Sequence, residues 1–201
     1  MGKRILLGSL VGSVVVFIVS SIWHLTPGLG EIGVKALPAE ETVLAGLSTS
    51  IHEPGFYYFP APNLAPGRTK EQKKADQAAY LEKYRRGPSG GLVYRPRGEG
   101  GEGLNFGKLM AYQFLFGLAG SFIVAWLLAT LALTAGSTTF GSRAWLALLF
   151  ALFGGIVYAL PEWNWYGFPA SYTIASIASM VVSWGIAGLA MAAIVKRPAA
   201  A

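Results

Sequence analysis

Apolar residues gather in four long blocks along the chain, and polar segments separate these blocks. They span residues 5–23, 109–134, 144–160 and 170–195, and none of them contains Asp, Glu, Lys, Arg or His. Each is close to the roughly 20 residues that an α-helix needs to cross about 30 Å of hydrocarbon. The pattern predicts four transmembrane helices, and the composition agrees, because 53% of the 201 residues are hydrophobic and 13% are charged.

The charges beside the blocks predict how the chain is oriented in the membrane. Lys and Arg near helix ends are retained on the cytoplasmic side. If the chain starts inside, five basic residues share that side, and Glu162 lies on the other. We therefore expect both termini in the cytoplasm, a long extracytoplasmic segment at 24–107 and a short outer hairpin at 161–169. The five basic residues are Lys3, Arg4, Arg143, Lys196 and Arg197.

The first block also resembles a signal peptide, since Lys3 and Arg4 precede it and residues 19–21 form a possible cleavage site. Its 19 residues exceed the usual apolar region of about 7 to 15 residues. Trp23 at its outer end is typical of an interfacial anchor. We interpret the block as a retained helix, with a cleaved signal peptide as the alternative.

Small residues recur at every fourth position within each block. Lipid tails give helices no hydrophobic reason to associate, so close approach along faces of small residues is the main route to packing. We expect these stripes to hold a four-helix bundle together; the alternative is a docking face for another membrane subunit. The stripes are Gly8, Gly12 and Ser20; Gly117, Ser121, Ala125 and Ala129; Ala147, Ala151, Gly155 and Ala159; and Ala175, Ser179, Ser183 and Ala187.

The segment between the first two blocks is too long for a simple connector and has structure signals of its own. Pro38 and the acidic residues after it predict the start of a helix that presents an apolar face as far as Ile51. Thr69 can cap a second helix that reaches Arg86, because Gly87 and a proline follow it. The aromatic run 56–59 and residues 92–94 predict two short strands.

The expected fold class is a membrane all-α protein, a four-transmembrane-helix bundle with a small α+β extracytoplasmic cap inserted between helices 1 and 2. The glycine-rich stretch 98–107 predicts a flexible connection to the second block. The chain then divides into the first transmembrane helix at 1–25, the cap and linker at 26–107, and a three-helix membrane domain at 108–201.

Aromatic side chains are frequent on the expected outer side. They predict an amphipathic layer at head-group depth, which either anchors the protein as an aromatic belt or lines a groove for a lipid or another ligand. The layer comprises Phe56, Tyr57, Tyr58, Phe59, Tyr94, Trp163, Trp165, Tyr166 and Phe168.

A polar clasp between cap and bundle is a further hypothesis. Arg95 follows the second strand, and Glu162 is the only acidic residue in the three-helix domain. A planar guanidinium suits a partly desolvated carboxylate, and Asn164 could complete the set. The alternative is that Glu162 is solvated and Arg95 meets a lipid phosphate.

Three motifs give the chain a family resemblance: PGFYYFP at 54–60, GPSGGLVYRP at 87–96 and PEWNWYGFP at 161–169. The combination resembles a family of small, uncharacterised bacterial membrane proteins. The resemblance implies a bacterial cytoplasmic, or inner, membrane, but it implies no activity and no site residues.

Little in the sequence points to chemistry. Cysteine is absent, which excludes thiolate nucleophiles and cysteine-ligated metals, and the two histidines, His24 and His52, lie outside the blocks. A transporter would normally place an ionisable group within a block. Nucleic acid is not an expected partner, because residues 26–107 carry ten basic and nine acidic side chains. We expect no catalytic residue, no metal and no cofactor.

Three functions remain open. The leading expectation is a non-catalytic accessory, assembly or stabilising subunit of a bacterial membrane complex, with membrane lipids and other membrane subunits as partners. The alternative is a protein that binds a lipid or hydrophobic ligand through the aromatic layer. The third is an enzyme or transporter of unfamiliar type, for which Glu162, Asn164, Arg95 and His24 are the candidate polar residues.

Overall fold

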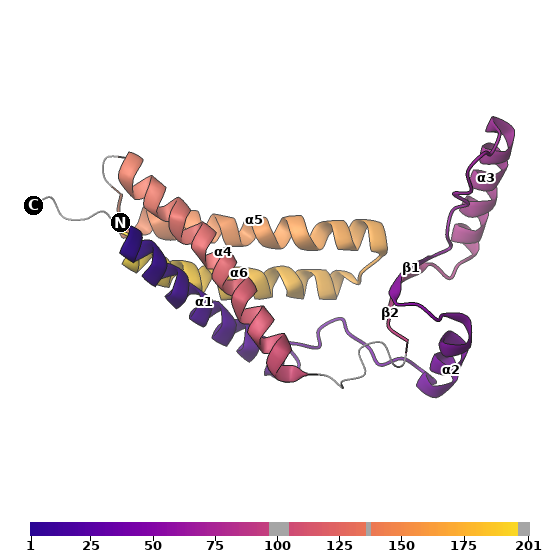
Figure 1. Cartoon of the computed structure of the whole chain (residues 1–201), viewed down its shortest axis with the longest axis horizontal. Helices are drawn as coiled ribbons and strands as arrows, with labels where there is room; N and C mark the ends of the chain where they lie inside the picture. Colours follow the sequence, from indigo (N-terminus) through magenta and orange to yellow (C-terminus); the bar gives the residue numbers. More distant parts are fainter. Residues whose placement is uncertain (97–104, 136–137, 197–201) are drawn as a thin grey trace, which may run out of the picture. The chain divides into compact units, whose positions relative to one another are not determined.

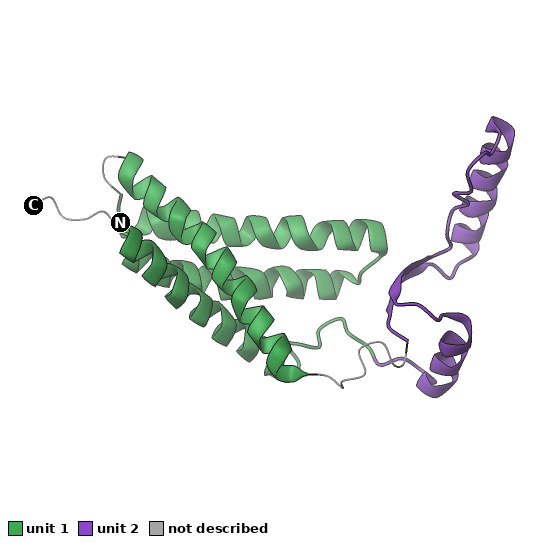
Figure 2. Cartoon of the chain, in the orientation of Figure 1, with its two compact units in different colours: residues 1–35, 104–201 green, residues 36–103 purple. Residues whose placement is uncertain are grey.

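The computed structural model describes residues 1–96, 105–135 and 138–196. The chain divides into two compact units, which are residues 1–35 with 104–201 and residues 36–103 (Figure 2). The described residues are mostly helical, with four helices long and apolar enough to cross a membrane and a small two-stranded sheet. These four helices confirm the corresponding part of the expected fold and indicate a multi-pass membrane protein.

The four long helices of the first unit each contain one apolar block. They are α1 (Gly2–Leu25), α4 (Phe106–Thr134), α5 (Phe140–Tyr166) and α6 (Ala170–Ile194). Asn105 and Thr139 cap the starts of α4 and α5, because their side chains accept hydrogen bonds from the backbone N–H groups of Lys108 and Ser142. Of the predicted connection at 98–107, residues 98–104 lie outside the described residues.

The third helix is longer than the sequence predicts, and the expected hairpin is correspondingly shorter. We expected Pro161 to end the helix, but α5 continues through it to Tyr166. Proline removes one backbone donor without preventing the residues after it from being helical. The helix ends where Gly167 adopts the left-handed conformation (φ 72°) and donates its N–H to the Glu162 carbonyl.

Helix α1 lies against both α4 and α6 and runs antiparallel to each (Figure 1). Its Ser13 hydroxyl donates a hydrogen bond to the Phe114 carbonyl of α4 over 3.1 Å. On the neighbouring face, Gly8 packs so closely that a Cβ built on it would lie 2.8 Å from Cγ2 of Val195. Small residues thus allow the helix backbones to approach closely. This is expected in a membrane, where the hydrophobic effect does not drive helices together and close packing does.

Helix α6 also packs against α5, in a second antiparallel seam. A Cβ built on Gly188 would lie 2.6 Å from the Cβ of Ala147, and one built on Gly155 would lie 3.4 Å from the Cα of Ile177. The pair α1–α4 and the pair α5–α6 lie together where α1 begins, and they diverge toward the end where α5 meets α6 (Figure 1).

The buried core of this unit consists mainly of small and medium side chains, while many of the large ones face outward. Leu128 and Met191 are fully buried among alanines, whereas Phe116, Trp126 and Phe153 are each exposed by 59% or more. A soluble protein would bury such large side chains. Their outward placement fits a lipid environment.

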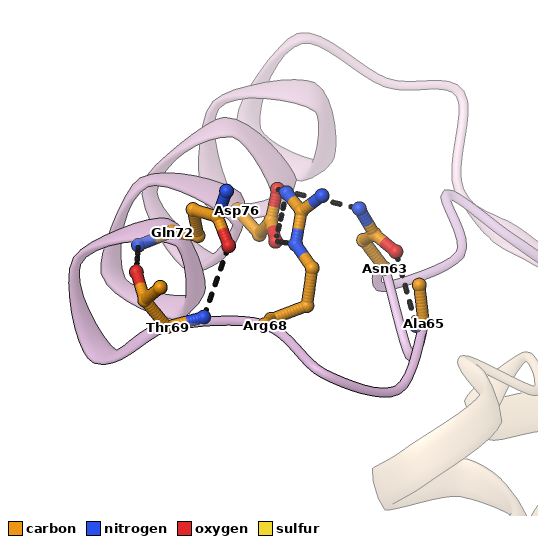
Figure 3. Close-up of polar contacts among 6 residues, drawn as sticks. All are labelled: Asn63, Ala65, Arg68, Thr69, Gln72 and Asp76. Carbon is orange, nitrogen blue, oxygen red and sulfur yellow. Dashed lines mark hydrogen bonds and ion pairs between the residues drawn. The ribbon is translucent and has the colours of Figure 1, made fainter.

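The second unit contains α2 (Glu40–Ser50), β1 (Gly55–Phe59), α3 (Lys70–Arg86) and β2 (Gly90–Tyr94), and the two strands pair antiparallel. These elements confirm the sequence-based prediction of two helices and two strands. The start of α3 has a capping box, in which the Thr69 hydroxyl accepts from the Gln72 N–H and the Gln72 side chain accepts from the Thr69 N–H. Figure 3 shows this box beside the ion pair of Arg68 with Asp76.

No side chain of this second unit is buried between residues 36 and 96, all of which the structure describes. Helix α3 is polar on all sides, and α2 has no buried residue. Two aromatic rings instead cover glycines across the sheet: Phe56 lies over Gly91, and Phe59 lies over Gly90. The unit has local order but no hydrophobic core.

Candidate functional site

A pocket of about 250 Å³ with both polar and apolar lining residues lies within the first unit, among α1, α4, α5 and α6. Its lining residues come from the later part of α1, the beginning of α4, the last turns of α5 and the first part of α6. One wall is a row of hydroxyl groups along α6, from Tyr172 through Ser176 and Ser179 to Ser183. These spacings of four, three and four residues place all four side chains on one helix face. Hydroxyl groups both donate and accept hydrogen bonds, so the wall can match a ligand in either role.

The other walls combine polar and apolar side chains. Helix α1 contributes Val16, Ser20, Trp23 and His24. The Nδ1 atom of His24 lies 2.8 Å from the Ser20 carbonyl oxygen, which can only accept, so Nδ1 is the donor and Nε2 is left for other contacts. The opposite helices contribute Gln113 from α4 and Tyr158 from α5; both side chains are substantially exposed.

The segment after α1, residues 26–35, folds across one end of the pocket, and we call it the strap. Its Leu29 and Ile32 line the pocket. Gly33 in the strap has a positive φ of 80°, and a Cβ built on it would lie 2.5 Å from the backbone nitrogen of Tyr172. Glycine is therefore required at this position for two reasons: the positive φ and the close contact with the start of α6.

Ser183 is the most deeply buried hydroxyl in the pocket wall. It is 2% exposed, and its Oγ has no hydrogen-bond partner among the described residues. Serine and threonine in membrane helices often bond to the carbonyl four residues earlier, as Ser9 and Thr173 do here. The Ser121 hydroxyl on α4, like that of Ser183, has no hydrogen-bond partner among the described residues, but Ser121 does not line this pocket. The described residues thus include two similar buried hydroxyls, Ser183 and Ser121, of which only Ser183 belongs to the lining of this pocket.

Arg143 forms a second polar feature, near the other end of the bundle. The sequence places it directly before the third apolar block, among the basic residues near helix ends, and it lies in the first turn of α5 with 5% of its surface exposed. Its Nε donates to the Ala192 carbonyl over 3.0 Å, and its Nη1 donates to the Thr138 carbonyl over 2.9 Å. Ala192 is in the last turn of α6, where carbonyls lack helical partners. Arg143 therefore acts as a side-chain cap between helices.

The residues that the stripes predict for helix packing lie inside the first unit. All nine of the main candidates are buried, whereas Ser20 and Ala175 are partly exposed and line the pocket. The nine are Gly8, Gly12, Gly117, Ser121, Ala125, Ala151, Gly155, Ser179 and Ser183.

The predicted aromatic layer and the predicted clasp each contain residues from both units. In the first unit, Trp163, Trp165 and Tyr166 end α5 with exposed side chains, and Phe168 follows them half-buried. The others, Phe56, Tyr57, Tyr58, Phe59 and Tyr94, belong to the sheet of the second unit.

Of the clasp residues, Arg95 follows β2, Glu162 lies half-buried in α5 and Asn164 is exposed in α5. Both the layer and the clasp stay predictions.

Comparisons with known proteins add no relative, because no protein-family model, no curated protein and no solved structure matches this chain.

Proposed function

We propose that this protein is a non-catalytic accessory or assembly subunit of a complex in the bacterial cytoplasmic membrane. The observation that carries the proposal is the second unit, in which no residue from 36 to 96 is buried. A two-stranded sheet is marginal alone in water, and a short polar helix gains little stability without packing. A partner surface would supply the burial that this unit lacks.

An apolar pair on the sheet suits such a contact. Phe56 and Val93 are paired in the strand register, and their side chains are 54% and 74% exposed. Interfaces gain most of their affinity from a few apolar or aromatic side chains that become fully desolvated. We take this pair as the centre of the contact with a partner membrane protein.

The proposal predicts a partner that depends on Val93. The tagged full chain, purified from its native membranes in a mild detergent, should retain an equimolar membrane protein. Val93→Asp should weaken this association about tenfold, because a buried charge would enter the contact. Ala79→Asp, which adds the same charge to an exposed position of α3, is the matched control and should retain the partner. A monodisperse full chain without any equimolar protein would contradict the proposal.

The orientation expected from the sequence belongs to the same proposal. The beginning of α1 and the end of α6 lie together, since Arg4 donates a hydrogen bond to the Lys196 carbonyl. Arg143 reaches the same end of α6. Basic residues at one end support a cytoplasmic location for both termini. The close packing of α1 against two other helices supports its retention rather than its removal as a signal peptide.

A fusion experiment tests this topology. A reporter that is active only outside the cytoplasm should work when it is inserted after Gly67 and fail when it is fused after Lys196. Replacement of Lys3 and Arg4 by neutral residues should leave the activities of both reporter fusions unchanged if Arg143 and Lys196 also determine the orientation. Reporter activity at the C-terminal fusion would overturn the assignment.

A further inference from the structure

We propose that the pocket among α1, α4, α5 and α6 binds an uncharged lipid head group that carries hydroxyl groups. This site is independent of the accessory role, because it lies wholly within the first unit. Two observations carry it: the cavity itself, and Ser183 in its wall, a residue that is 2% exposed and whose buried hydroxyl has no hydrogen-bond partner among the described residues.

The unpartnered hydroxyl indicates that the ligand is polar. A buried polar group without a hydrogen bond costs about 1–3 kcal/mol. Ser183 could avoid this cost by donating to the carbonyl of residue 179, as Ser9 does to Ile5. It lies instead against the cavity, in one row with Ser176 and Ser179. A ligand with hydroxyl groups could both accept from this row and donate to it.

The pocket walls contain no carboxylate, ammonium or guanidinium group, and His24 is the only lining residue that can carry a positive charge, which indicates that the head group is uncharged. None of the lining residues, all of which are described, is Asp, Glu, Lys or Arg. A phosphate or carboxylate placed there would lose its hydration without gaining a counter-charge. The two arginines described in this unit lie elsewhere, because Arg4 and Arg143 both contact the end of α6.

The shape and depth of the pocket favour a lipid over a water-soluble polyol. Tyr172 and Ser183 are 11 positions apart, which corresponds to about 16 Å along a helix. A volume of about 250 Å³ spread over this length makes a narrow site. Ser183 is near the middle of α6, and apolar side chains such as Val16 and Trp184 alternate with the hydroxyls in the walls. Such a mixed lining suits the region where a head group joins an acyl chain.

The test is a titration of the purified full chain with 1-monodecanoylglycerol, in a zwitterionic detergent that has no hydroxyl groups. Native mass spectrometry counts the bound molecules, and thermal unfolding measures the stabilisation that binding confers. We expect one saturable site. Decanoate, which is charged, and methyl decanoate, which lacks hydroxyls, should bind at least about tenfold more weakly. Equal binding of either would overturn the assignment of the head group.

Two serine variants distinguish the pocket from general lipid adhesion. Ser183→Ala should weaken binding about three- to tenfold, which corresponds to the loss of one hydrogen bond. Ser121→Ala removes an equally buried and unpaired hydroxyl outside the pocket and should bind as the wild type does. Neither change removes a described hydrogen bond, so both variants should fold. Equal affinity of the two variants would overturn the assignment of the binding site to this pocket. Tight binding of free glycerol would overturn the assignment of the ligand as a lipid.

Discussion

Gly188→Ala is expected to destabilise the bundle, although alanine is the better helix former. The added methyl group would meet the Cβ of Ala147, which is fixed to the backbone of α5 and cannot rotate away. Overpacking of this kind costs about 1–3 kcal/mol, whereas the gain in helix propensity is about 1 kcal/mol. Gly188→Leu should prevent the two helices from packing at all.

Gly185→Ala, one turn earlier on α6, is the matched control. The nearest atom to its added Cβ would be the mobile Cδ1 of Leu148 at 3.4 Å, an ordinary contact. We expect the stability of this variant to match or exceed that of the wild type. The measurement is the thermal unfolding midpoint in detergent, together with the yield of folded protein. If both alanine variants unfolded at the same temperature, the close α5–α6 seam at Gly188 would not exist.

Arg143→Met is expected to cause the second large loss of stability. The change keeps much of the side-chain length but removes the donors to the carbonyls of Ala192 and Thr138. Hydrogen bonds from a charged group contribute about 1.5–3 kcal/mol each. The guanidinium also lies at the negative end of the α6 dipole, where a positive charge is favourable. We expect a total loss of about 3 kcal/mol or more.

Two further variants separate geometry from charge at this position. Arg143→Lys keeps the charge but has a single nitrogen, which cannot serve both carbonyls at once, so it should recover only part of the stability. Lys3→Met removes an exposed cation near the beginning of α1 and should have little effect. Full stability of Arg143→Lys would show that charge alone matters. Full stability of Arg143→Met would show that the buried contacts contribute nothing.

The long-range order in this fold follows patterns that are readable in the sequence. Apolar blocks of about 20 residues predict spanning helices, and small residues at every fourth position predict their contact faces. Capping residues act over three or four positions, which is why Thr69 predicts the start of α3 correctly. In contrast, the third apolar block ends at Leu160 in the sequence, whereas α5 continues through Pro161, because a proline blocks one hydrogen bond and need not end a helix.

The candidate site was harder to foresee. Arg143 bonds to backbone carbonyls, one of them 49 positions away, and carbonyls carry no sequence signature. The pocket is lined by residues of four helices and of the strap, and no single one of these segments encodes it. One signal was present: Tyr172, Ser176, Ser179 and Ser183 share a face of α6. We interpreted Ser179 and Ser183 as packing residues, and both are indeed buried, but they also line a cavity.

The position of α1 between α4 and α6 has a consequence for biosynthesis. Helix α1 is made before both of its packing partners, α4 and α6, which are the second and the fourth of the long helices described. Until α4 follows, some 80 residues later, the glycine and serine face of α1 has only lipid or another protein to contact. The bundle closes when α6 arrives, since α6 also holds α5 in place. The contacts among these helices are therefore completed only after translation of α6, and a chain truncated before Ala170 would leave small-residue faces open on both α1 and α5.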